Sequence, residues 1–85
     1  MNIKVLYFAR IKESVNYSSE ELSLPTGVTT VRLLKQYLST RGDVWAKIFT
    51  GKQVVRAAIN HELVDDQAQI KAGDEVAFFP PVTGG

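Results

Sequence analysis

The fold of this chain is set by its closing residues, Glu75-Val76-Ala77-Phe78-Phe79-Pro80-Pro81-Val82-Thr83-Gly84-Gly85. The segment before the prolines is apolar and aromatic, which predicts a final strand with Val76 and Phe78 toward the core. The two prolines lack backbone N–H donors and hold φ fixed, so that strand must stop after Phe79. The sequence therefore predicts one domain over residues 1–79 and a flexible, extended tail over residues 80–85.

The tail is predicted to carry the carboxylate of Gly85 into a pocket on another protein, along Pro80, Pro81, Val82, Thr83 and Gly84. At about 3.3 Å per residue the tail reaches roughly 20 Å. Glycines without Cβ atoms pass a narrow channel and leave the last carbonyl open to attack. A carboxylate is ionised at neutral pH and is a poor electrophile, so it needs activation, for example as a mixed anhydride with AMP. These residues alone leave sulfur carriage and protein conjugation both open.

The run from Ala77 to Gly85 and the opening Ile3-Lys4-Val5-Leu6-Tyr7-Phe8-Ala9-Arg10 resemble the small, sulfur-carrier subunits of molybdopterin synthase. The resemblance extends over the whole length, including Ala57-Ala58-Ile59-Asn60 and Leu63-Val64. It is weakest in residues 14–24 and 39–53. The tail is its most specific part.

That resemblance implies a pathway for the terminal carboxylate. An E1-like enzyme would use ATP to adenylate Gly85, and a sulfur donor would convert it to a thiocarboxylate. The large subunit of molybdopterin synthase, in a heterotetramer, would then transfer the sulfur to cyclic pyranopterin monophosphate and build the molybdopterin dithiolene. Catalytic residues are expected on that subunit, so this chain is a co-substrate with no stably bound cofactor and is not an enzyme by itself.

Two other carriers share the expected fold and Gly-Gly end. A thiamine-pathway sulfur carrier is one, although its tail is not expected to read Phe-Phe-Pro-Pro-Val-Thr. A ubiquitin-related modifier, which forms isopeptide bonds to lysines, is the other. A purely structural adaptor would tolerate loss of Gly85, whereas a carrier would not.

Composition excludes several classes of function. A chain of 85 residues makes one domain with little room for an enclosed active site. Its 10 Lys and Arg against 9 Asp and Glu give no nucleic-acid footprint. No apolar run has the length of a membrane helix, so we expect no membrane contact and a cytoplasmic location. Cysteine is absent, which removes thiolate metal sites, and any carried sulfur must sit on the C-terminal carbon.

The pattern of residues predicts an α+β domain. Two strands, residues 2–9 and 19–24, should form a hairpin with a long polar connection through Ser14 to Ser18. A helix capped by Thr29 or Thr30 should run to about Thr40, with Val31, Leu34 and Leu38 buried. A helical turn over residues 43–49, a strand over 53–60, a turn with a short strand after Asn60, and the final strand follow. This order fits a β-grasp, or ubiquitin-like, domain, in which one main helix packs across a mixed sheet.

The remaining polar and aromatic candidates favour structural roles. His61 has no cysteine partner and is expected in a turn. The pairs Glu20-Glu21 and Asp65-Asp66 are expected to be solvated charges, because neighbours in extended chain point apart. Lys35 is expected on the solvent side of the helix, and Trp45 is expected to close the core in preference to forming a ligand platform.

The first and last strands are neighbours in a β-grasp fold. Alternation then turns Leu6, Phe8, Ala77 and Phe79 away from the core. Phe8, Phe79 and Leu63 are predicted to form an exposed apolar patch at the base of the tail, where a partner binds. The alternative is that a loop or the 43–49 helical turn covers them.

Overall fold

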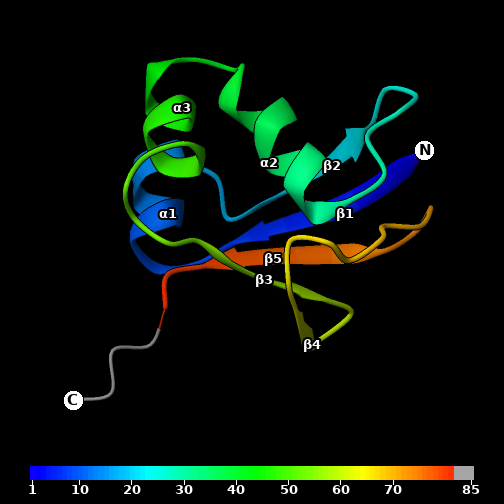
Figure 1. Ribbon diagram of the computed structural model, residues 1–85. Helices are drawn as coiled ribbons and strands as arrows, with labels where there is room; N and C mark the ends of the chain where they lie inside the picture. Colours follow the sequence, from blue (N-terminus) through cyan, green and yellow to red (C-terminus); the bar gives the residue numbers. More distant parts are fainter. Residues whose placement is uncertain (82–85) are drawn as a thin grey trace.

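The computed structural model describes residues 1–81 and consists of a sheet with three helices on one side (Figure 1). The elements are β1 (Asn2–Tyr7), α1 (Ala9–Val15), β2 (Ser19–Ser23), α2 (Val31–Ser39), α3 (Asp43–Phe49), β3 (Arg56–Ile59), β4 (Glu62–Val64) and β5 (Glu75–Phe79). None of the helices within residues 1–81 is long and apolar enough to cross a membrane.

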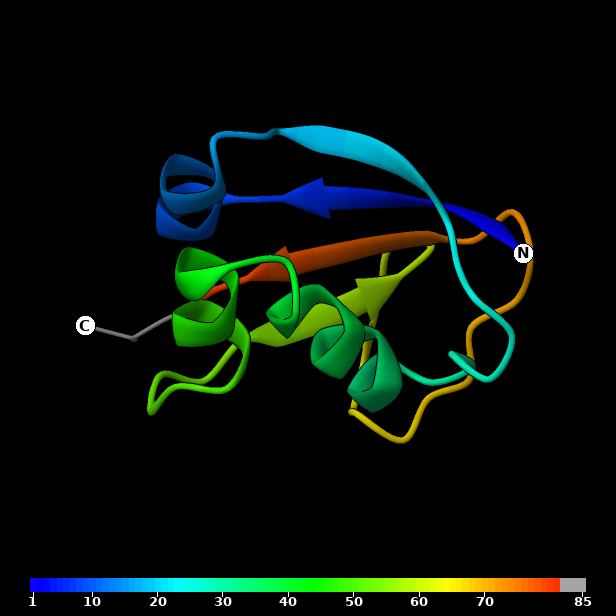
Figure 2. The same ribbon diagram turned by 90° about the horizontal axis from the view of Figure 1, so that it is seen from above.

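The five strands form one sheet in the order β2-β1-β5-β3-β4 (Figure 2). The first strand pairs with the last in parallel, and the other neighbouring strands pair antiparallel. The sheet is therefore mixed, with β5 at its centre between β1 and β3. This arrangement confirms the predicted β-grasp architecture.

The core lies between the sheet and the helices. Helix α2 contributes Val31, Leu34 and Leu38, all 0% exposed, at the spacing of one helical face. The Thr30 hydroxyl accepts a hydrogen bond of 3.2 Å from the backbone N–H of Leu33, which satisfies one free donor of the first turn. Val76 and Phe78 face these side chains from β5 and are also 0% exposed. The predicted main helix and the predicted inward face of the last strand are both confirmed.

The connection between β1 and β2 differs from the prediction. The sequence predicted a strand to residue 9 and a polar connection through Ser14 to Ser18, whereas the strand ends at Tyr7 and α1 occupies Ala9–Val15. The helix buries Ile11 and Val15, which are four residues apart and so lie on one face. Those two apolar contacts with the core outweigh the polar composition of the segment.

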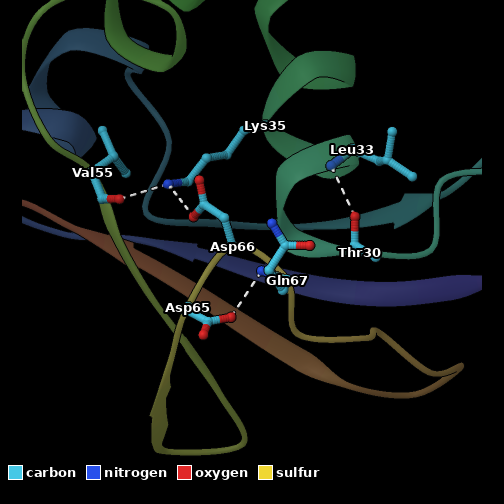
Figure 3. Close-up of polar contacts among 7 residues, drawn as sticks. All are labelled: Thr30, Leu33, Lys35, Val55, Asp65, Asp66 and Gln67. Atoms are coloured by element: carbon cyan, nitrogen blue, oxygen red, sulfur yellow. Dashed lines mark hydrogen bonds and ion pairs between the residues drawn. The ribbon is translucent and has the colours of Figure 1, made fainter.

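Lys35 is the second correction, because it does not lie free on the solvent side of α2. Its Nζ donates a hydrogen bond of 2.7 Å to the carbonyl of Val55 and pairs with Oδ1 of Asp66 at 2.8 Å (Figure 3). The Lys35 side chain is only 13% exposed. It ties the helix to the segment before β3 and to the loop after β4. Asp66 is therefore paired, and Asp65 caps the backbone N–H of Gln67 over 2.9 Å, so neither is merely a solvated charge.

Strand β3 begins at Arg56, three residues later than the predicted strand over 53–60. The turn at Asn60 and His61 has φ values of 49° and 73°, which are uncommon for residues other than glycine. The side chain of Asn60 helps to hold this turn, since Oδ1 accepts from the backbone N–H of Glu75 and Nδ2 donates to Asp74, each over 3.0 Å. His61 is a turn residue, as predicted.

Candidate functional site

The base of the predicted tail lies at the end of the central strand. β5 ends at Phe79, and Pro80 and Pro81 have no regular secondary structure. Phe79 pairs with Arg56 of β3 on one side, and the chain after Tyr7 of β1 lies on the other. The tail residues Val82, Thr83, Gly84 and Gly85 lie outside the described residues, so their proposed roles stay predictions.

The sheet face opposite the helices carries a row of apolar side chains across four strands. The register places Leu6 beside Ala77, Ala77 beside Ala58, and Ala58 beside Leu63. Their neighbours along each strand, among them Val5, Val76 and Ala57, point into the core and are at most 2% exposed. We call this surface the outer patch, and it consists of Leu6, Phe8, Ala58, Leu63, Ala77 and Phe79.

Phe8 lies beside Phe79 at one end of the outer patch. Its backbone is extended, with φ −123° and ψ 154°, and its N–H donates a hydrogen bond of 3.1 Å to the carbonyl of Phe78. Phe8 therefore continues the strand pairing although β1 ends one residue earlier. Phe8 is 48% exposed and Leu63 is 65% exposed. The sequence-based alternative, in which a loop or α3 covers these side chains, is wrong for both of them.

The chain turns sharply after Phe8. Ala9 has φ 53°, in the left-handed region that residues with a Cβ rarely adopt, and α1 begins there. Ile11 and Val15 hold α1 against the core on the inner side. The turn ends the strand directly after Phe8 and leaves its ring at the rim of the outer patch.

A polar network on the opposite face supports the strands that carry this patch. The Tyr7 hydroxyl donates to Oε2 of Glu20 over 2.7 Å, and the Arg41 guanidinium binds both Glu20 oxygens at 2.6 and 2.9 Å. Burial, and then the bond to Glu20, raises the pKa of Tyr7 well above its ordinary value. Burial alone would raise the pKa of Glu20, but hydrogen bonds from Arg41 and Tyr7 outweigh it and lower that pKa. Glu20 is therefore a buried ionic anchor, contrary to the predicted solvated charge, whereas Glu21 is exposed.

Trp45 completes this network. Its ring meets Tyr7 edge-on at 5.6 Å and stacks near Phe49 at 6.2 Å. The Arg41 guanidinium carbon lies 4.6 Å from the Trp45 ring centroid, within the range of a cation–π contact. The prediction that Trp45 closes the core is confirmed.

The structure adds two members that sequence reasoning did not identify. Ala58 joins the outer patch because β3 lies between β5 and β4, and Arg56 lies at its edge because it pairs with Phe79. Strand register decides both positions. The alternation of residues 54–59 was readable, but which residue of β5 lies opposite each one was not.

Comparison with protein families and curated proteins agrees with this geometry. The ThiS family model matches residues 5–85. The molybdopterin synthase sulfur carrier subunit of Escherichia coli is 41% identical over 83 residues, which cover 98% of this chain and 99% of that protein.

Two solved structures carry the likeness into three dimensions. A putative molybdopterin converting factor subunit 1 from Pyrococcus furiosus is 32% identical with a TM-score of 0.76, covering 96% of this chain and 99% of its own. A complex of subunits 1 and 2 of molybdopterin-converting factor from Helicobacter pylori contains a chain that is 26% identical with a TM-score of 0.68, with full coverage of both chains. The chain described here thus belongs to the ThiS family and, within it, to the molybdopterin synthase sulfur carrier subunits.

Proposed function

We propose that this chain carries sulfur as a thiocarboxylate on Gly85 and delivers it for assembly of the molybdopterin dithiolene. The observation that supports this most is the position of the outer patch. An exposed apolar surface lies on the strand that ends in Pro80-Pro81, directly before a sequence that closes in Gly-Gly. A partner that binds the patch would be placed to receive the chain that follows.

The chemistry begins with an unreactive group. An ionised carboxylate is a poor electrophile, so an E1-like enzyme would attack ATP with the Gly85 carboxylate, release pyrophosphate and leave an acyl adenylate. Sulfur from a donor would then displace AMP and leave the thiocarboxylate. Because activation consumes ATP, we propose a cytoplasmic location. The nucleotide would be bound by the activating enzyme, and the carrier needs no resident cofactor.

Transfer needs a second partner, the large subunit of molybdopterin synthase. In this proposal the large subunit holds cyclic pyranopterin monophosphate and the catalytic residues, and two copies of each subunit form a heterotetramer. The Helicobacter pylori complex of subunits 1 and 2 supports such a pairing. The described part of this chain supports the division of labour, since its buried polar network of Tyr7, Glu20 and Arg41 is engaged in holding strands and helices together.

Each part of the tail has a role in this mechanism. Pro80 and Pro81 keep the chain from joining the sheet, because they lack N–H donors. Val82 and Thr83 span the distance to the partner's site. Gly84 and Gly85 pass a narrow entrance and present an unhindered acyl group.

The intact mass of the protein tests this proposal. The full chain is incubated with its cognate activating enzyme, ATP and a sulfur source, and then measured by mass spectrometry. We expect a gain equal to the exchange of one oxygen for one sulfur, located on the terminal residue by fragmentation. A chain that gains no sulfur but becomes linked to lysines of other proteins would overturn the proposal in favour of a ubiquitin-related modifier.

A further inference from the structure

One charged side chain lies at the tail end of the outer patch. Arg56 is the first residue of β3, is exposed, and pairs directly with Phe79 of β5. Ala57, its neighbour along the strand, is buried at 2% exposure and pairs with Phe78. Arg56 therefore extends on the same face as Phe79, and side chains paired in this way have Cβ atoms about 5 Å apart.

The arginine is not engaged by the acidic side chains around it. Ion pairs within residues 1–81 are Lys35–Asp66, Arg41–Glu20 and His61–Glu75, and none of them includes Arg56. Asp65 follows the β4 residue that pairs with Ala57, but its Oδ1 accepts from the backbone N–H of Gln67. Within the same range, the cation–π contact is made by Arg41 and Trp45, not by Arg56.

A partner that covers Phe79 must also cover Arg56. Burying a guanidinium without a counter-charge is strongly unfavourable, whereas pairing it with a carboxylate through two parallel hydrogen bonds restores much of what hydration supplied. Arginine suits this role because its planar fork matches a carboxylate and it is always charged. The outer patch thus requires an acidic residue from whatever protein binds it through Phe79.

We propose that Arg56 is a specificity residue for the large subunit of molybdopterin synthase, which meets it with an Asp or Glu carboxylate beside the Phe79 contact. This inference rests on the proposed function and adds a chemical requirement on the partner. The apolar contacts supply area, while the arginine fixes the orientation in which the tail enters. A partner with an apolar or basic residue at that point would be rejected.

The test measures the affinity of the full-length chain for its large subunit by titration calorimetry. Arg56→Met keeps the length and apolar stem but removes the charge, and it leaves the partner's carboxylate buried alone. We expect Arg56→Met to weaken binding at least about tenfold and Arg56→Glu at least about thirtyfold. Arg56→Lys keeps the charge and should recover most of the affinity lost in the methionine variant.

Two controls separate recognition from folding. Arg32→Met removes an exposed arginine from α2, on the helical side of the sheet, and should bind as the unchanged chain does. Thermal unfolding of each Arg56 variant should match that of the unchanged chain, because the side chain has no ion pair to lose within residues 1–81.

Phe79→Asp, measured in parallel, separates the two proposals. If Phe79→Asp weakens binding and Arg56→Met does not, the arginine is not a recognition residue and only this inference fails. If both variants bind normally while folded, the outer patch is not the docking surface, and the proposed partner contact fails with it.

Discussion

The Tyr7 hydroxyl on β1 donates a hydrogen bond of 2.7 Å to Glu20 on the adjacent strand β2, from a side chain that is only 1% exposed. Arg41 approaches the same carboxylate from the chain after α2, so one buried charge joins two strands and a helix end. Tyr7 also directly precedes Phe8 of the outer patch. The network on the inner face therefore fixes the strand that carries the patch on the outer face.

Glu20→Gln should destabilise the domain at neutral pH. The substitution removes the charge that Arg41 and Tyr7 bind, and hydrogen bonds to charged groups contribute about 1.5–3 kcal/mol each. Because an amide oxygen still accepts one bond, we expect a loss of about 1–2 kcal/mol in the free energy of unfolding, measured in urea. Glu21→Gln, at an exposed position of the same strand, is the matched control and should have little effect.

The same residue predicts a pH dependence. The folded-state pKa of Glu20 lies below its unfolded value, so its contribution is present above the unfolded pKa, about 4.3, and is lost as pH falls through the folded pKa. The difference in stability between the unchanged chain and Glu20→Gln should therefore shrink on acidification. A difference that stays constant from neutral pH down to strongly acidic pH would show that the carboxylate charge is not what stabilises the network.

Sequence patterning predicted the larger elements because their signals are local. The bounds of β5 and α3 match the predicted ranges, and Thr30 caps α2 as one of two proposed residues. Helix α1 was missed because it is only 7 residues long and its polar residues outnumber its two core contacts. The spacing of Ile11 and Val15 was the one signal that could have indicated it.

The site was predictable only as far as alternation reaches. Alternation correctly turned Phe8 and Phe79 outward, because period-two geometry follows from the strand itself. The pairing of Arg56 with Phe79 and the bond from Lys35 to Val55 depend on which distant segments become neighbours. No local pattern encodes those relationships, so they required the structure.

Phe8→Asp should weaken binding to the large subunit without unfolding the domain. The Phe8 ring is already 48% exposed, so a charge there costs the monomer little, whereas an aromatic anchor in a docked interface contributes about 2 kcal/mol or more, roughly thirtyfold in affinity. Val44→Asp is a matched control, since Val44 is 47% exposed on α3, away from the patch. Equal loss of affinity in both variants would argue against a specific contact at Phe8.

Replacing Pro80 and Pro81 together by glycine tests whether a stiff exit matters. Neither proline lies in a strand or helix, so the midpoint of thermal unfolding should barely change. Glycine adds conformational freedom that must be lost when the tail enters a partner, so sulfur transfer should become less efficient. Single-turnover transfer from a pre-formed thiocarboxylate is the measurement, because it bypasses activation. Transfer at the unchanged rate would mean that the prolines serve only to end β5.

Gly85 provides the sharpest prediction, because the chain contains no cysteine and its one methionine is a thioether that cannot form a persulfide. Deleting Gly85 leaves a chemically similar carboxylate on Gly84, but about 3.3 Å short of where a partner's site expects it. A misplacement of only 1 Å can cost about a hundredfold in rate, so the deletion should abolish sulfur transfer while affinity for the large subunit through the outer patch is retained. Adding one residue after Gly85 should fail in the same way, because the wrong carboxylate then occupies the adenylation site. Molybdopterin formation by either variant, with its terminus verified by mass, would show that the terminal carboxylate is not the working group.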